Sequence, residues 1–275
     1  MGLRSTVRQF LFPPKQTLGN SYAPMLPELE NLAARVGVEI MRHHGTPVQV
    51  NTKPDGSPVT AADQAAEELI ILALSYLLPG VPVIAEEAYS LGTGPEPDIS
   101  GGKFWLVDAL DGTGEFLKNG TDFTVNIALI ENAIPVLGVI HHPTTQITYI
   151  GAGEGTAMRV HPDGRREDIG ASFADGGLRI VSSKSYGNEI QLVKYLAGRQ
   201  IREHRHRASS IKFCEVAEGR ADLYPRFGPS REWDTAAGHA IVLAAGGDVT
   251  TSAGQPLLYG KENFVNSDFV ARGQR

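Results

Sequence analysis

The sequence predicts an α+β fold built from two packed halves, and three observations predict it. Two helical patterns open the chain, the first over residues 27–44 and the second ending before Pro79-Gly80. A series of strand patterns joined by short turns follows between residues 123 and 160, and from residue 178 onward strands and helices alternate. A chain of 275 residues, 41% of them hydrophobic, is long enough for one large domain of two halves. We expect the halves to cover about residues 25–170 and 171–275.

Charge and cysteine content narrow the function classes. The formal net charge is −6, from 25 basic and 31 acidic residues, which argues against nucleic-acid binding but leaves room for a small anionic substrate. Cys214 is the single cysteine, so a disulfide framework and a cysteine-based zinc site are excluded, and a reducing compartment is the natural reading. We expect no signal peptide and no integral membrane segment, because the longest apolar run, Leu69–Leu78, is too short to span a bilayer. Residues 1–24 are expected to form a flexible N-terminal extension.

In the first half, hydrophobic spacing predicts an amphipathic helix over residues 27–44, and alternation predicts a strand over residues 48–53. Turn residues predict a loop over residues 54–58, after which a second helix begins with Thr60 or Asp63 as its cap. We expect the buried side of this second helix to consist of Leu69, Leu72, Ala73, Tyr76 and Leu77.

The remaining elements follow from the same rules. A short strand over residues 81–85 ends in Glu86-Glu87, an exposed loop rich in Gly and Pro covers residues 90–103, and a hydrophobic strand begins at Phe104. An antiparallel meander is expected over residues 123–130, 134–140, 145–150 and 156–160. In the second half we expect strands over 178–183 and 221–227, a last strand from residue 248, and helices over 188–197, 211–219 and 233–247.

The hydrophobic strand 104–107 runs directly into Asp108, with Asp111 and Gly112 close behind. Two carboxylates at the end of a buried strand repel each other and lose hydration, and a divalent cation removes both penalties. Mg²⁺ takes oxygen ligands, so Asp108, Asp111 and the carbonyl of Leu110 suit a magnesium site. An isolated motif of this kind can equally be a strand followed by an Asp-Gly turn.

Other carboxylates also lie where secondary-structure elements begin or end. Asp63 lies at the start of the second helix, Glu86-Glu87 follow a strand, and Asp234 opens the helix 233–247. Side chains at such positions can converge on one site. Taken singly, Asp63 is equally well explained as a helix cap and Glu86-Glu87 as a solvated strand end.

Together these residues resemble the motif set of the inositol monophosphatase superfamily, the lithium-sensitive, magnesium-dependent phosphatases. Four ordered blocks match, over about residues 27–270, and Ala109 replaces the usual proline of the third block, at a cost of about 0.4–1 kcal/mol in chain entropy. Within the superfamily, the segments 104–108, 123–130, 209–214 and 217–229 look most like the CysQ-type 3′(2′),5′-bisphosphate nucleotidases. The four blocks are Asp63, Glu86-Glu87, Asp108-Ala109-Leu110-Asp111-Gly112-Thr113 and Trp233-Asp234-Thr235-Ala236-Ala237.

The resemblance implies a layered α/β/α/β/α fold of the sugar-phosphatase type and a site for two or three Mg²⁺ ions. It implies that Thr113, hydrogen-bonded to Asp63, orients and helps deprotonate the attacking water, and that Glu87 holds a further water or a third metal. The backbone N–H groups of Gly112 and Thr113 can hold phosphate oxygens. The implied metal ligands are Glu86, Asp108, the Leu110 carbonyl, Asp111 and Asp234.

A bisphosphorylated nucleotide needs a cationic seat for its second phosphate, and Lys212 and Arg226 are the candidates. Each alone could instead form a surface salt bridge of little energetic value. The full set of expected substrate-binding residues is Glu86, Leu110, Asp111, Gly112, Thr113, Ser209, Lys212, Arg226 and Asp234.

Three functions are consistent with these residues. The favoured one is a phosphomonoesterase that removes the 3′-phosphate of adenosine 3′,5′-bisphosphate (PAP), and also of its sulfated relative PAPS. The second is inositol monophosphatase or fructose-1,6-bisphosphatase activity, and the third is a catalytically silent phosphate-binding protein. The expected partner is a small phosphorylated nucleotide, the oligomeric state is open, and the resemblance implies a cytoplasmic protein, in some members peripheral at the inner membrane.

Overall fold

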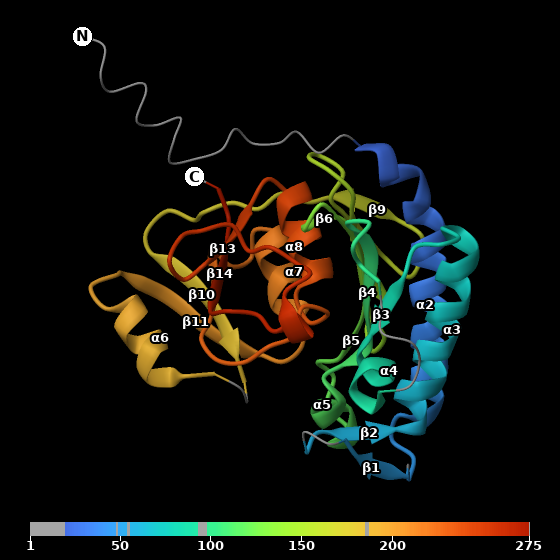
Figure 1. Cartoon of the computed structure of the whole chain (residues 1–275). Coiled ribbons are helices and arrows are strands. Elements are labelled where there is room, and N and C mark those ends of the chain that lie inside the picture. The colour runs from blue at the N-terminus through green and yellow to red at the C-terminus, as the bar shows by residue number, and fades with distance from the viewer. Residues whose placement is uncertain (1–19, 48, 54–55, 93–97, 185–186, 275) are drawn as a thin grey trace.

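The chain folds into five layers in which helices and sheets alternate (Figure 1). The structure, a computed structural model, describes residues 20–47, 49–53, 56–92, 98–184 and 187–274. The layers confirm the expected α+β fold of the α/β/α/β/α type. In order they are helices α2 (Leu26–His43) and α3 (Ala61–Leu77), a seven-stranded sheet, helices α7 (Ile211–Ala217) and α8 (Ala236–Ala244), a five-stranded sheet, and helix α6 (Glu189–Leu196).

The seven-stranded sheet contains the expected meander. Its strands pair antiparallel in chain order except β3, which lies parallel to β4. The tight turn between β5 and β6 has Asn132 and Ala133 at φ 52° and 64°, the left-handed conformation that two-residue hairpins favour. β9 was not expected. The strands are β3 (Val83–Ala85), β4 (Lys103–Asp111), β5 (Thr124–Glu131), β6 (Ile134–His142), β7 (Ile147–Gly151), β8 (Met158–Val160) and β9 (Arg166–Asp168).

The five-stranded sheet is mixed, and two of its strands were missed from the sequence. The edge strand β11 has the highly charged sequence IREHRHR, which hides a strand because it lacks hydrophobic alternation. The strand that begins at Asp248 was expected to be the last, which is wrong, because β14 follows it and pairs with it. In spatial order the strands are β11 (Ile201–Arg207), β10 (Leu178–Ser183), β12 (Leu223–Arg226), β14 (Phe269–Arg272) and β13 (Asp248–Thr251).

Two large hydrophobic cores lie on the two faces of the seven-stranded sheet. The first lies between this sheet and helices α2 and α3, around Leu29 and Trp105. The second lies between the two sheets and surrounds α7 and α8, with Phe213 and Ile241 fully buried. Helix α8 lies directly on β6, because a Cβ added at Gly138 would lie 2.3 Å from the carbonyl oxygen of Ala237. The site described below lies where these layers meet.

The expected buried face of α3 is wrong. Leu69, Leu72 and Tyr76 are 42%, 57% and 79% exposed, whereas Asp63 and Glu67 are buried together with four apolar residues, Ala62, Ala66, Ile70 and Leu74. The helix is apolar on several sides, so its periodicity does not define one buried face. The two buried acids lie on the face turned toward the site.

The flexible extension expected over residues 1–24 is wrong for its last residues. Residues 1–19 lie outside the described residues, but the short helix η1 (Asn20–Met25) is packed, and the Tyr22 hydroxyl donates a hydrogen bond of 2.8 Å to Glu131. Residues 20–24 therefore belong to the packed domain. Among the helices of the described part, none is long and apolar enough to cross a membrane.

Three smaller boundaries also differ from the expected ones. The loop expected at 54–58 ends earlier, since β2 (Pro58–Thr60) pairs with β1 (Val50–Thr52); residues 48 and 54–55 lie outside the described part. Glu86-Glu87 begin a short helix, α4 (Glu86–Leu91), so the expected loop at 90–103 starts later, with residues 93–97 outside the described part. Helix α8 starts at Ala236, so Asp234 lies in the turn before it.

Candidate active site

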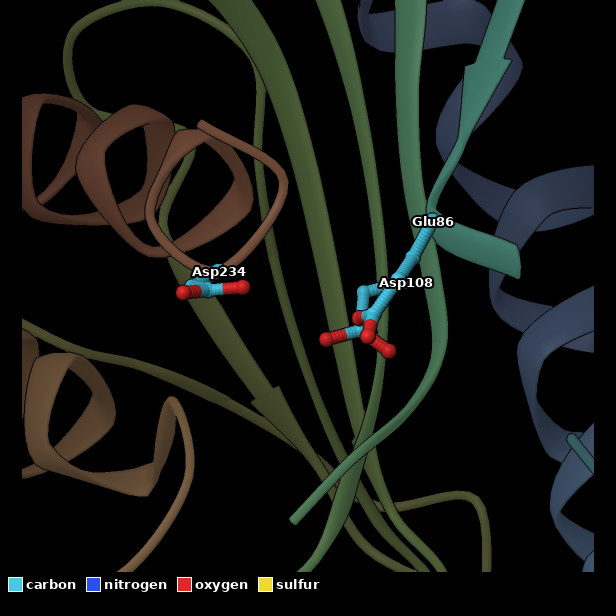
Figure 2. Close-up of side chains that lie close together, drawn as sticks. All are labelled: Glu86, Asp108 and Asp234. Carbon is cyan, nitrogen blue, oxygen red and sulfur yellow. The ribbon is translucent and has the colours of Figure 1, made fainter. Parts of the chain in front are cut away.

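Three carboxylates from separate elements meet at one point. The ligand oxygens of Glu86, Asp108 and Asp234 lie within 4.8 Å of one another. Parallel pairing sets Ala85 beside Val107, which brings the next residues, Glu86 and Asp108, together. Figure 2 shows these two carboxylates side by side, with Asp234 facing them from the side of α8. The fold therefore brings together three of the four carboxylates expected to bind metal.

A break in the β4 ladder positions the remaining ligands. Pairing with β5 is regular as far as Asp108 and shifts before Asp111, as in a β-bulge. The Asp108 carboxylate accepts a hydrogen bond of 3.0 Å from the Leu110 N–H. Gly112 has φ 101°, and a Cβ there would lie 2.9 Å from the Asp122 carbonyl oxygen, so this turn requires glycine. The Leu110 carbonyl and Asp111 thus lie beside Asp108, although Asp111 lies outside the tight group of three.

Thr113 and Asp63 are in contact. Thr113 begins helix α5 (Thr113–Leu117), and its Oγ1 lies 3.1 Å from Asp63 Oδ1 and 3.2 Å from the Leu110 carbonyl oxygen. The other oxygen of Asp63 accepts from the backbone N–H of Thr60 at 2.7 Å and from its hydroxyl, which forms a capping box at the start of α3. Thr60 is therefore the N-cap of α3, and Asp63 is the first-turn acid that completes the capping box as well as the partner of Thr113.

Two charged residues of the site were missed from the sequence. The Lys53 ammonium is buried 2.5 Å from Glu86 Oε1 and 2.9 Å from Glu87 Oε1. The Glu67 carboxylate accepts the backbone N–H groups of Glu87 and Ala88 at 2.7 and 2.8 Å, and so holds the first turn of α4. The signal for Glu67 was its place one turn after Asp63, on the same face of α3.

The site concentrates negative charge that burial makes costly. Burial, and then repulsion from Glu86, Asp111 and Asp234, raises the pKa of Asp108 well above its usual value. Burial, followed by repulsion from Asp111, raises the pKa of Asp234 to about 8. Burial likewise raises the pKa of Asp111 to about 6, although Lys212 opposes this shift. A cation bound among these oxygens would relieve both the lost hydration and the repulsion.

The donor set fits a hard metal ion. All the converging ligand atoms are carboxylate or carbonyl oxygens, which Mg²⁺ and Ca²⁺ prefer. Burial and the charge of Glu86 raise the pKa of Glu87 to about 8, and its Oε2 atom is buried with no hydrogen-bond partner among the described residues. Burial lowers the pKa of Lys53, but Glu86 and Glu87 outweigh that effect and hold it above its ordinary value. The lysine thus already supplies one positive charge, and the remaining negative charge of the cluster can attract a metal ion.

A cavity of about 510 Å³ extends from these carboxylates toward the second half of the chain. Its lining contains Glu86, Asp108, Asp111 and Asp234 together with six basic residues. Such a cavity suits a substrate with more than one anionic group. The basic lining residues are Lys118, Lys184, Arg207, Lys212, Arg226 and Arg231.

Ser209, Lys212 and Arg226, expected to bind substrate, all line this cavity. Ser209 adopts φ 50° just before α7, and the Lys212 ammonium donates to its carbonyl and lies 5.3 Å from the centre of the Tyr224 ring. Lys212 is only 4% exposed, so it is not a surface salt bridge, and burial lowers its pKa to about 8. Arg226 donates to Ser183 Oγ at 2.6 Å, which fixes its guanidinium at the cavity wall.

Comparison with known proteins identifies the family. The model of the inositol monophosphatase family matches residues 21–273, and the chain belongs to this family. The chain is 45% identical over 250 residues to the 3′(2′),5′-bisphosphate nucleotidase CysQ of Escherichia coli (strain K12), covering 89% of this chain and 98% of that protein. It is 41% identical over 261 residues to the CysQ of Buchnera aphidicola, covering 93% and 96%.

Solved structures agree with this assignment. The crystal structure of CysQ from Bacteroides thetaiotaomicron has a TM-score of 0.74 and 35% identity, and the match covers 89% of this chain and 95% of that one. An IMPase of Thermotoga maritima has a TM-score of 0.70 and 25% identity, with 90% and 91% covered. Both the family resemblance and the layered fold expected from the sequence are therefore confirmed.

Proposed function

We propose that this chain is a 3′(2′),5′-bisphosphate nucleotidase that hydrolyses the 3′-phosphate of PAP to give AMP and inorganic phosphate, and that PAPS is a second substrate. One observation carries the proposal beyond the family: a single cavity is lined both by the carboxylate cluster and by two cations, the buried Lys212 and the half-buried Arg226. The nucleotidases named above, 41–45% identical over most of the chain, support the same activity.

We further propose that Mg²⁺ is the metal, with two or three ions per site. Glu86, Asp108 and Asp234 would hold it together with Asp111 and the Leu110 carbonyl, all of them oxygen donors. When bound, Mg²⁺ lowers the pKa of the attacking water and neutralises charge on the leaving oxygen of an in-line displacement.

The protein's own residues orient the attacking water. Thr113 Oγ1 donates a hydrogen bond to Asp63 Oδ1, 3.1 Å away, so its lone pairs can accept a hydrogen bond from the attacking water. As Oγ1 takes the proton of the water, its own proton passes to Asp63. Because Asp63 is fixed by two further hydrogen bonds from Thr60, the threonine hydroxyl has a defined direction. Gly112 and Thr113 line the cavity, and their backbone N–H groups are proposed to hold the phosphate oxygens. Glu87, buried beside Lys53, is proposed to hold a further water or a third metal.

The second phosphate distinguishes PAP from inositol monophosphate. Inositol monophosphate has no second anion to place beside Lys212 and Arg226, so these two cations of the cavity wall favour the bisphosphorylated nucleotide. Ser209 lies next to them in the cavity wall and is proposed to contact the same substrate. We also propose a cytoplasmic location, because the single cysteine, Cys214, is a buried free thiol.

The test is Mg²⁺-dependent phosphate release from PAP, with the nucleotide product separated by chromatography. The proposal predicts AMP carrying its 5′-phosphate, no reaction in EDTA, and no reaction with the Asp108→Asn variant. Release of the 5′-phosphate would contradict the assignment of the 3′-phosphate to the carboxylates and of the 5′-phosphate to Lys212 and Arg226. Binding without any phosphate release would instead indicate the catalytically silent alternative.

A further inference from the structure

The ion pair between Lys184 and Glu115 lies at the cavity, and its lysine is more exposed than Arg207 and Lys212, two other cations of the cavity. Lys184 directly follows β10, and Glu115 lies in α5, two residues after Thr113. Their side chains meet with 2.9 Å between Nζ and Oε2, and both residues line the cavity. The lysine side chain is 52% exposed, whereas the glutamate side chain is 11% exposed.

The glutamate is the fixed member of this pair. A Cβ added at Gly120 would lie 2.7 Å from Glu115 Oε2, so the carboxylate lies tight against the backbone of that turn. The Glu115 carbonyl also accepts the N–H groups of Lys118 and Gly120 at 3.1 and 2.8 Å. The lysine, in contrast, is a flexible stem that ends in a half-exposed ammonium. Its charge can therefore move to another anion while Glu115 stays in place.

Other cations of the cavity are held more firmly. Arg207 donates to Asp122 at 3.0 Å and to Glu215 at 3.1 Å, so its guanidinium bridges two acids. Lys212 donates to backbone carbonyls and is buried. Lys184 lies next in sequence to Ser183, whose hydroxyl accepts from Arg226, so Lys184 and Arg226 lie at the same part of the wall.

We propose that Lys184 is a specificity-determining residue that leaves Glu115 and binds the second phosphate of the bisphosphorylated substrate. This inference rests on the proposed function. Glu115 is the partner of the lysine in this structure and competes with the substrate for its ammonium. The exchange is favourable because a phosphate group carries nearly two negative charges and three acceptor oxygens, against one charge on the carboxylate.

The test compares PAP with adenosine 3′-monophosphate, which differs only in lacking the second phosphate. Lys184→Met keeps the apolar stem and removes the charge. It is expected to raise KM for PAP about tenfold or more and to leave KM for the monophosphate within about twofold. Lys184→Arg is expected to restore most of the PAP affinity, and Lys194→Ala, on the exposed surface of α6, is the matched control.

Glu115→Gln tests the competing partner. This change keeps the size of the side chain and removes its charge, so KM for PAP is expected to stay the same or to fall. Equal rises in KM for both substrates with Lys184→Met, or no change for either, would overturn the inference, as would a rise for PAP alone with Glu115→Gln. Failure of the proposed function is distinguishable, since the unmodified protein would then not hydrolyse PAP at all.

Discussion

Replacing Asp108 by asparagine is expected to abolish activity while making the metal-free protein more stable. The asparagine keeps the shape of the side chain and an oxygen that can accept from the Leu110 N–H. It removes one negative charge from a group whose ligand oxygens lie within 4.8 Å of one another. The variant thus separates the effect of charge repulsion on stability from the role of the carboxylate in activity.

The magnitude follows from Coulomb's law. At 4.8 Å and an effective dielectric constant of about 20, each pair of full charges repels by about 3.5 kcal/mol. Part of this repulsion is already relieved by protons, because burial raises the pKa of Asp234 to about 8. We therefore expect a net gain of about 2 kcal/mol in EDTA at pH 7. For a chain of this size that gain raises the unfolding temperature by about 5 °C.

The assay is thermal unfolding of both proteins in EDTA and in Mg²⁺, together with phosphate release from PAP. In Mg²⁺ the order of stability should reverse or the difference should vanish, because the variant lacks one of the proposed metal ligands. A variant that is less stable in EDTA would refute the electrostatic reasoning. Activity within a few-fold of the unmodified protein would refute the role of Asp108 in metal binding.

Three further perturbations test other parts of the structure. Thr113→Ala is expected to lower kcat about a hundredfold or more with little change in KM, and Asp63→Asn is expected to have a similar effect. Fully additive losses of kcat in the double variant would show that the two residues do not act as a unit. In EDTA the unfolding temperature should fall as pH rises from about 5 to 8, because the folded state retains protons on groups such as Asp234, with a pKa of about 8, that the unfolded state has released. Added Mg²⁺ should flatten this dependence, and an equally steep curve with Mg²⁺ would argue against metal binding at these carboxylates. Gly138→Ala is expected to lower the free energy of unfolding by about 1–3 kcal/mol, because its Cβ would lie 2.3 Å from a backbone carbonyl oxygen of α8. Gly101→Ala is the control and should be nearly neutral, because no atom lies within 4 Å of the added Cβ. Equal effects of the two changes would contradict the packing of α8 on β6.

Much of the acid cluster was predictable because its members lie at the ends of elements. Asp108 follows one hydrophobic run and Glu86 follows another. Because the two strands are adjacent, their carboxylates lie together, which argues against the alternative that each is a solvated strand end. Ordered motifs added Asp234, whose partner elements lie more than a hundred residues away. Local periodicity also predicted the meander correctly, since its strands β5, β6 and β7 are largely buried and are joined by short turns.

Other features depend on tertiary structure and leave little local signal. Lys53 occurs in a polar stretch with turn residues, and only the folded chain brings its ammonium to Glu86 and Glu87. Helix α3 misled the prediction because its apolar residues surround it, while the residues it buries toward the site include the acids Asp63 and Glu67. The charged strand β11 forms through pairing with β10 alone, at the edge of its sheet, where hydrophobic alternation is not required.

The most direct test of the account is the ratio of kcat/KM for PAP to that for inositol 1-phosphate, measured in Mg²⁺ with the same preparation. One charge-assisted contact to the second phosphate contributes about 1.5–3 kcal/mol, which corresponds to a ratio of about ten to a hundred or more in favour of PAP. A ratio near one, or a preference for inositol 1-phosphate, would contradict the claim that the basic residues of the cavity bind a second phosphate.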